Sequence, residues 1–191
     1  MNSSPPSFTD SLQELATVLA ASAVLAPAVG RVSDAILHSL RQGGKLLTCG
    51  NGGSAADALH LAEELVGRYQ RERRALPAIC LCADPTALTC IGNDYGYERV
   101  FARGLEAFGK KGDVLVAFTT SGNSPNVLEA LAAARRLGVL TVLLTGKDGG
   151  KARALCDHAL IVPSQTTARI QEVHTLILHQ WLEAIDAQDW A

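Results

Sequence analysis

Five short runs of apolar residues, alternating with helical patterns, constrain the fold of this chain more than any other feature. The runs occupy residues 45–49, 78–82, 113–118, 140–145 and 158–162. Apolar residues recur at helical spacing at 54–69, 86–108 (interrupted by GNDYGY at 92–97), 126–138 and 166–187. Strands that are apolar on both faces and alternate with helices are typical of a parallel sheet covered on both sides. We therefore predict an α/β fold, a three-layer sandwich around a five-stranded parallel sheet.

The first 44 residues form a helical region that precedes the first strand. Apolar residues follow a rough helical period through it, and Ser11 and Glu14 have the spacing of a capping box. Pro27 is expected to kink or split the helix. Gly43 and Gly44 are expected to end it.

The same region contains an apolar stretch, residues 15–29, that could be mistaken for a signal peptide or a membrane span. Acidic rather than basic residues precede it, whereas a signal peptide begins with positive charge. The stretch is also too short to cross a bilayer comfortably. A helix that is apolar on all sides has more apolar surface than the core of one domain can cover. We therefore expect residues 1–44 to pack between subunits, residues 45–191 to form the domain, and no contact with a membrane.

Charge and cysteine content disfavour two classes of protein. The formal net charge is −2, and a nucleic-acid-binding protein usually needs a basic surface. The arginine-rich run at residues 68–74 is interpreted as a solvated helix end. Five cysteines, an odd number, do not suggest a disulfide framework. Reduced thiols fit the cytoplasm, where we predict that the protein resides.

Two polar loops follow strands in the same structural setting. Residues 49–54 read CGNGGS and residues 119–126 read TTSGNSPN, and each loop lies between a predicted strand and a predicted helix. Ligands of open parallel sheets bind at the carboxyl ends of the strands, and helix N-termini attract anions. The second loop offers four hydroxyl groups, those of Thr119, Thr120, Ser121 and Ser124. Hydroxyls together with backbone N–H groups suit a phosphate monoester.

Three other interpretations of these loops are weaker. Ser124 before Pro125 could simply cap a helix, but a cap would explain one hydroxyl and not four. The glycines resemble a dinucleotide-binding fingerprint only superficially, because the nearest acidic candidate, Asp84, lies too far along the chain. The G-x-x-x-x-G-K-[ST] sequence of a P-loop is absent.

The two loops also carry a resemblance to a known family. TTSGNSPN and CGNGGSAADALHLAEEL are similar to the sugar isomerase (SIS) domain, whose Ser/Thr-rich loop holds a sugar phosphate. IGNDYGYE, LTGKDGG and RIQEVH resemble the phosphoheptose isomerase subfamily in order and spacing. The resemblance implies a single SIS domain with a flavodoxin-like sheet. It also implies a homotetramer, with sites shared between subunits, that isomerises sedoheptulose 7-phosphate to D-glycero-D-manno-heptose 7-phosphate, a precursor of bacterial surface polysaccharide.

The resemblance further implies which residues form the site. Sugar and phosphate contacts fall on Asn51, Gly52, Gly53, Glu64, Asn93, Asp94, Thr119, Thr120, Ser121, Ser124 and Gln171. A zinc ion, present in some members, would be held here by His60, Glu64, Gln171 and His179. Some members carry an aspartate just before RIQEVH, where this chain has Ala168. The role of that carboxylate is either absent here or supplied by another residue, such as Asp57 or Asp94.

An aldose–ketose isomerase moves a proton between neighbouring carbons through an enediol, which requires a base at the carbons and an acid or metal at the oxygens. His60 and Glu64, four residues apart on a predicted helix, share a face with about 40° between them. Gln171 and His179 are about 80° apart on the last helix, and Glu172, about 20° from His179, stays an alternative. We expect Glu64 to be the base at the carbons. We expect His179 to act at the sugar oxygens or in ring opening.

Taken singly, these side chains have ordinary interpretations. His60 could be a core or surface histidine, and Glu64 could form a solvated pair with Glu63. His179 lies in the apolar stretch LILHQWL, where a hydrogen-bonded core histidine is the default. His174 has the same setting but points away from His179 around the helix, so no role is assigned to it.

Two rival functions and one chemical conflict stay open. Some SIS relatives are non-catalytic and bind a partner such as a replication initiator, but His60, Glu64 and His179 favour an enzyme here. A sugar-phosphate sensor is disfavoured because the chain has no added basic helix-turn-helix. If zinc is bound, Glu64 is a weaker base, since the metal stabilises its charged form. Either Glu64 shifts between the two roles or another group moves the proton.

Overall fold

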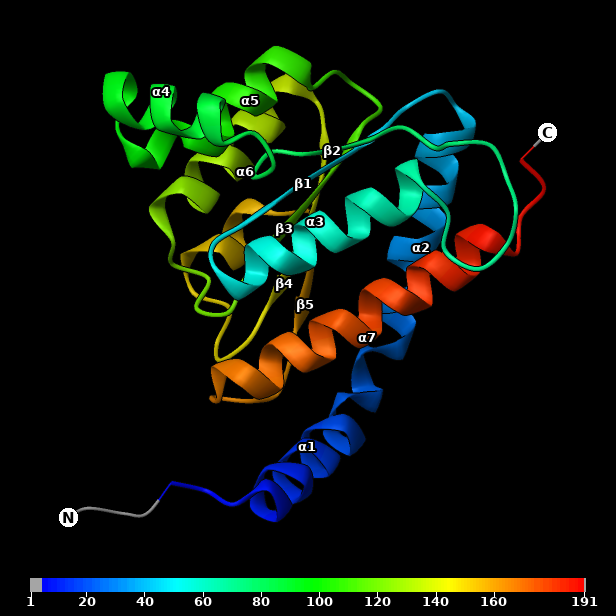
Figure 1. Cartoon of the computed structure of the whole chain (residues 1–191), viewed down its shortest axis with the longest axis vertical. Helices are drawn as coiled ribbons and strands as arrows, with labels where there is room; N and C mark the ends of the chain where they lie inside the picture. The colour runs from blue at the N-terminus through cyan, green and yellow to red at the C-terminus, as the bar shows by residue number, and fades with distance from the viewer. Residues whose placement is uncertain (1–4, 191) are drawn as a thin grey trace.

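The predicted sheet is present, and its strands are all parallel (Figure 1). The computed structural model describes residues 5–190. Its strands are β1 (Leu46–Gly50), β2 (Ala78–Cys80), β3 (Val114–Thr119), β4 (Leu140–Thr145) and β5 (His158–Ile161). They lie in the order β2-β1-β3-β4-β5, which is the flavodoxin-like order. In this order the winding direction reverses between β1 and β3.

Helices cover both faces of this sheet, as the continuous apolar runs predict (Figure 1). One face packs against α2 (Ala26–Arg41), α3 (Gly53–Val66) and α7 (Thr167–Asp186), and the other against α5 (Val100–Phe108) and α6 (Pro125–Leu137). Successive strand residues point to opposite faces, so Leu46 and Val116 lie in the first core and Leu47 and Leu115 in the second. The prediction of a three-layer sandwich is confirmed.

The helical region after β2 is interrupted where GNDYGY predicts a break. α4 (Pro85–Tyr95) ends at Gly96, whose φ of 86° is in the left-handed region, and η2 (Tyr97–Arg99) leads into α5. Asp84, the acidic residue considered for a dinucleotide site, instead caps α4. Its carboxylate accepts hydrogen bonds from the N–H groups of Thr86 and Ala87 at 2.9 and 3.1 Å.

The N-terminal helix is split near Pro27, as predicted. α1 (Phe8–Ser22) is followed by η1 (Ala23–Leu25), and Pro27 lies in the first turn of α2. α1 extends away from the sheet (Figure 1), and Val18 is its one buried residue. α2, in contrast, packs into the core of the sheet. The assignment of residues 1–44 to subunit packing stays a prediction.

The prediction that Ser11 and Glu14 form the capping box of α1 is wrong. The capping box lies about one turn earlier and consists of Ser7 and Asp10. Ser7 Oγ accepts from the N–H of Asp10 at 3.2 Å, and the Asp10 carboxylate accepts from the N–H of Ser7 at 2.9 Å. The helix has therefore begun before Ser11. The Glu14 carboxylate instead accepts a hydrogen bond from the hydroxyl of Thr166, before α7.

The helical region Phe8–Arg41 is long and apolar enough to cross a membrane, with a mean hydropathy of 1.7 over its most apolar window. One such helix is weak evidence of a membrane span, because the core helices of soluble proteins and signal sequences meet the same criterion. Its exposed apolar side chains include Phe8, Leu12, Leu19 and Val24.

His174 of α7 is a fully buried core histidine. Its Nε2 lies 3.3 Å from the carbonyl oxygen of Thr145, and its ring packs edge-on against Phe118. Burial lowers the pKa of His174 from 6.5 to about 4, although the Thr145 carbonyl opposes this shift. The ring is therefore neutral in the folded protein at pH 7.

This buried histidine predicts a pH dependence of stability. The unfolded chain binds a proton on His174 near pH 6.5 and the folded chain only near pH 4. The free energy of unfolding should therefore fall as pH decreases between these values, by at most about 1.4 kcal/mol per pH unit for one proton. Denaturant titrations should show a smaller pH slope for His174→Gln than for wild type, with His158→Gln as the control. Equal slopes for wild type and His174→Gln would contradict this origin.

Candidate active site

The two polar loops lie side by side at the carboxyl edge of the sheet. β1 and β3 are neighbours, and Gly50 at the end of β1 pairs with Phe118 near the end of β3. α3 begins at Gly53 and α6 at Pro125, so each loop ends at a helix N-terminus. This is the point where the winding direction reverses, which is where ligands bind in folds of this class.

The loop after β1 is shaped for close approach of a ligand. Gly52 has φ 56° and ψ −123°, a backbone conformation that only glycine adopts readily. A Cβ atom at this position would meet no neighbour within 4 Å, so the backbone faces open space. Asn51 is half-buried, and its side chain exchanges two hydrogen bonds with Asn126 of α6. The sequence analysis missed Asn126.

The hydroxyls of the loop after β3 are not used to cap α6. Ser124 is the N-cap residue, but its side chain accepts no hydrogen bond from the helix N-terminus. Its Oγ instead lies 3.2 Å from Oγ1 of Thr119. The sequence therefore locates the N-cap correctly at Ser124 before Pro125, but the Ser124 hydroxyl does not make the capping bond. Thr120, Ser121 and Ser124 are half-buried, so their hydroxyls remain accessible at the start of α6.

Residues 149–152, at the end of the LTGKDGG segment and just after it, pack against the loop that follows β3. A Cβ atom on Gly122 would lie 1.9 Å from the carbonyl oxygen of Gly149, so the two backbones touch. The N–H of Ala152 donates to the carbonyl of Gly122 at 2.9 Å, and the N–H of Lys151 donates to Asn123 Oδ1 at 3.1 Å. These contacts explain why the glycines are needed and fix the shape of the loop.

The side chains of Asn93 and Asp94 bond to each other. Both are exposed near the end of α4, and Asn93 Nδ2 donates to Asp94 Oδ1 at 2.7 Å. Among the described residues, neither side chain bonds to the loops after β1 and β3. Their contact with substrate stays a prediction.

The remaining predicted residues lie along the contact between α3 and α7, which run parallel (Figure 1). We call this contact the α3–α7 seam; its residues are Gly53, Asp57 and His60 of α3, and Gln171, Thr175 and His179 of α7. A Cβ atom on Gly53 would lie 2.5 Å from Gln171 Nε2. One turn on, Thr175 Oγ1 donates to Asp57 Oδ1 at 3.0 Å. The rings of His60 and His179 follow, with centroids 5.0 Å apart.

Asp57 is buried in the middle of the seam. It is 8% exposed, and its Oδ2 has no hydrogen-bond partner within residues 5–190. Burial raises the pKa of Asp57, while the hydrogen bond from Thr175 and the nearby His60 act in the opposite direction. Asp57 and Asp94 are the two candidates to replace the aspartate that some relatives carry where this chain has Ala168. Asp57 lies within the seam, whereas Asp94 lies exposed on α4.

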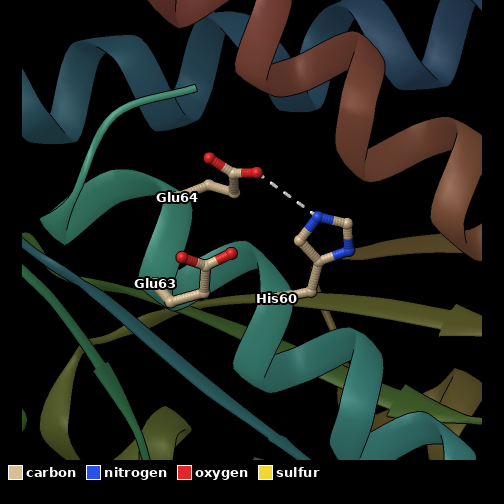
Figure 2. A group of neighbouring side chains, drawn as sticks. All are labelled: His60, Glu63 and Glu64. Atoms are coloured by element: carbon tan, nitrogen blue, oxygen red, sulfur yellow. Dashed lines mark ion pairs between the residues drawn. The ribbon is translucent and has the colours of Figure 1, made fainter. Parts of the chain in front are cut away.

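His60, Glu64 and His179 come together at the far end of the seam. His60 Nε2 lies 3.5 Å from Glu64 Oε1, as Figure 2 shows. The His179 ring packs edge-on against His60 and stacks on Tyr69, 5.8 Å away. The carboxylate of Glu63 also lies within 4.8 Å of the ligand atoms of His60 and Glu64 (Figure 2), a grouping that could hold a metal ion. The sequence analysis assigned no role to Tyr69, and it named Glu63 only as a possible solvated partner of Glu64; the Glu63 side chain is exposed.

Arg73 holds this end of the seam together. Its side chain is 4% exposed and forms an ion pair with Asp186 of α7, Nε to Oδ1 at 3.0 Å. It also donates to the carbonyl oxygens of Glu64 and Leu65 at 2.7 and 3.0 Å. The interpretation of residues 68–74 as a solvated helix end is wrong for Arg73, because a carboxylate on α7 and the free carbonyls of α3 require it as a partner.

The two loops at the carboxyl edge of the sheet and the His60–Glu64 group lie far apart within one copy. Glu64 follows Gly53 by eleven residues of α3, which is about 16 Å along the helix axis. Gln171 precedes His179 by eight residues, about 12 Å. The structure therefore brings together His60, Glu64 and His179, and it places Gln171 beside the loop after β1.

The fold and these motifs are those of the SIS domains. The family model described as "SIS domain" matches residues 7–146, which is more than half of the chain. The chain therefore belongs to the SIS domain family.

Individual relatives narrow the family further. Phosphoheptose isomerase 1 of Campylobacter jejuni is 53% identical over 174 residues, 91% of this chain and 94% of the relative. Phosphoheptose isomerase of Helicobacter hepaticus is 52% identical over 164 residues, 86% of this chain and 84% of the relative. The solved phosphoheptose isomerase of Neisseria gonorrhoeae is 42% identical with a TM-score of 0.88, covering 93% and 95% of the two chains. Within the SIS domains, the chain belongs to the phosphoheptose isomerase family.

The contact between Gly53 and Gln171 at the start of the seam can be tested by substitution. In Gly53→Ala the new methyl group would displace the amide of Gln171, so we expect kcat/KM to fall by roughly 10–100-fold. The double variant Gly53→Ala/Gln171→Ala has no clash, because the Gln171 amide is gone. The double variant should therefore be no less active than the single variant Gln171→Ala. Ala56→Ser, on the exposed side of α3, is the matched control. A fully active Gly53→Ala enzyme would contradict the importance of this contact.

Proposed function

We propose that this protein converts sedoheptulose 7-phosphate to D-glycero-D-manno-heptose 7-phosphate, a precursor of bacterial surface polysaccharide. The observation that carries the proposal is the similarity to phosphoheptose isomerases over nearly the whole chain. The same similarity favours an enzyme over a non-catalytic SIS protein that binds a replication initiator, because the relatives named above are isomerases.

The proposed phosphate grip uses the two loops at the carboxyl edge of the sheet. The hydroxyls of Thr120, Ser121 and Ser124 are half-buried and free of helix capping, so they can donate to phosphate oxygens. The N-termini of α3 and α6 add N–H groups and the positive ends of their dipoles. Gly52 lets the sugar approach the backbone, and Gln171 beside Gly53 offers an amide to it.

The proposed proton transfer uses the other end of the seam. Glu64 removes the proton from the carbon next to the carbonyl and returns it to the neighbouring carbon, which forms and then collapses an enediol. Its side chain is 18% exposed, which limits competition from water. His179 transfers protons at the sugar oxygens or assists ring opening. Tyr69 and His60 flank its ring and hold it in place.

The donor set at this end fits zinc. Two imidazoles and a carboxylate are frequent zinc ligands, and His60 Nε2 and Glu64 Oε1 already face each other. His60, Glu64 and His179 would hold the ion. Gln171, the fourth proposed ligand, lies about 12 Å along α7 from His179 and would have to come from another copy. Bound there, zinc would polarise the sugar oxygens. A Glu64 that binds zinc is a weaker base, so coordination through one oxygen, or release during turnover, would be needed to keep it active.

The distance of about 16 Å along α3 from Gly53 to Glu64 supports a site built from more than one copy. A sugar phosphate held by the loops of one chain does not reach Glu64 of the same chain along α3. Apolar surface is available for assembly, because a groove of about 550 Å³ between the N-terminal helices and α7 is lined by Leu19, Val29 and Leu176 among others. We propose a homotetramer with shared sites, located in the cytoplasm, where the five free cysteines stay reduced.

Replacing the proposed base tests the chemistry. Glu64→Gln keeps the shape but cannot accept a proton, so kcat should fall by about 10²–10⁴-fold while the protein stays folded. Glu72→Gln, whose side chain is 88% exposed and lies outside the His60–Glu63–Glu64 grouping, is the matched control and should retain most of the activity. Product analysis by NMR after incubation with sedoheptulose 7-phosphate is the measurement. Normal turnover by Glu64→Gln would refute the assignment.

Mixing two inactive variants tests whether sites are shared. Glu64→Gln chains are co-expressed with chains that carry Ser121→Ala and Ser124→Ala, and doubly tagged oligomers are purified. Some sites would then combine intact loops from one copy with an intact Glu64 from another, so activity should reappear. Mixed oligomers that remain inactive would show that each site lies within one chain.

Metal analysis tests the zinc proposal. We expect mass spectrometry to find about one zinc ion per chain in protein purified without chelator. His60→Ala should bind zinc more weakly in calorimetric titrations, while His158→Ala, on β5, should bind it as wild type does. Equal affinity in His60→Ala and wild type would rule out this set of ligands.

A further inference from the structure

Asn51 and Asn126 form a reciprocal pair that joins the two anion-binding loops. Asn51 Nδ2 donates to Asn126 Oδ1 at 2.9 Å, and Asn126 Nδ2 donates to Asn51 Oδ1 at 2.8 Å. Asn51 belongs to the loop after β1, and Asn126 lies in the first turn of α6, directly after the loop after β3. A third segment joins them, because the hydroxyl of Tyr97 in η2 donates to Asn51 Oδ1 at 3.1 Å.

The backbone fixes which way both amides point. The N–H of Val127 donates to Asn126 Oδ1 at 3.0 Å, so this atom must be an oxygen. Asn51 therefore has to present its nitrogen to Asn126 Oδ1 and its oxygen to Asn126 Nδ2. Asn126 is 2% exposed, so water cannot substitute for these partners.

Counting donors and acceptors shows what Asn51 can still offer. Its Oδ1 has two lone pairs, and both are occupied, one by Asn126 Nδ2 and one by the Tyr97 hydroxyl. Its Nδ2 has two N–H groups, and one of them is bonded to Asn126. The side chain of Asn51 can therefore act on a ligand only as a donor through its second N–H, which suits the oxygens of a phosphate or a sugar.

We propose that Asn126 is a positioning residue, which holds Asn51 with its free N–H turned to the phosphorylated ligand and locks the two loops at one spacing. The inference deepens the proposed function and rests on it. Asn126 acts through Asn51 and the loop backbone rather than by touching the ligand. A purely structural role at the start of α6 would instead affect stability and leave ligand affinity unchanged.

Asn126→Asp changes one hydrogen bond of the pair and keeps the other two. The carboxylate has the same shape and still accepts from Asn51 Nδ2 and from the N–H of Val127, and its charge is favourable at a helix N-terminus. It cannot donate to Asn51 Oδ1, and it adds negative charge beside the anion. Two oxygens then face each other in a place that water does not reach, so we expect the thermal midpoint to fall. We expect KM for sedoheptulose 7-phosphate to rise roughly tenfold or more, with a smaller change in kcat.

Two further variants control the interpretation. Tyr97→Phe removes one of the two hydrogen bonds to Asn51 Oδ1. KM should therefore rise, but by a smaller factor than in Asn126→Asp. Asn126→Ala, Asn51→Ala and the double variant form a cycle in which the two effects on KM should not add, because both changes break the same pair.

The experiment measures kcat, KM and the thermal midpoint of each variant, and the dissociation constant of inorganic phosphate by calorimetry. Weaker phosphate binding and raised KM in Asn126→Ala, which adds no charge, with no further weakening in the double variant, would support the proposal. Unchanged affinities, or additive effects in the cycle, would overturn it. If wild type does not isomerise sedoheptulose 7-phosphate, the proposed function fails, and the phosphate titrations still decide the role of Asn126.

Discussion

The parallel packing of α3 against α7 is the interaction on which the functional arrangement depends. Gly53 meets Gln171, Asp57 bonds to Thr175, and the His60 ring packs against His179. Beyond them the buried ion pair of Arg73 and Asp186 closes the contact, and removing one partner of such a pair typically costs about 3–5 kcal/mol. A shift by one helical turn would separate every one of these pairs, so the register of the two helices sets the geometry of the proposed catalytic group.

The seam also connects two chemically different regions. At its start, glycines, hydroxyls and helix N-termini lie together at the reversal point of the sheet, an arrangement suited to an anion. At its far end, two imidazoles and a carboxylate form a group suited to proton transfer or metal binding. About 16 Å of helix separates them, and this distance supports the proposal that a second copy completes each site.

The sequence allowed the fold to be predicted because its signals are local. Continuous apolar runs mark buried parallel strands, and glycine- and hydroxyl-rich loops at their ends mark the ligand edge. The errors concern contacts between distant segments. Arg73 looked solvated because its partner, Asp186, lies 113 residues away. Asn126 ends the TTSGNSPN motif, but nothing near it in the sequence indicates that its partner is Asn51. Nothing near Tyr69 indicates that it stacks on His179, so only the folded chain reveals these contacts.

A crystal structure of Glu64→Gln with sedoheptulose 7-phosphate tests the central claim most directly. The account predicts the phosphate within hydrogen-bond distance of the Ser121 and Ser124 hydroxyls, and the first two carbons of the sugar beside residue 64 of another copy. A phosphate bound away from these loops, or sugar carbons remote from both residue 64 and His179 of every copy, would contradict it.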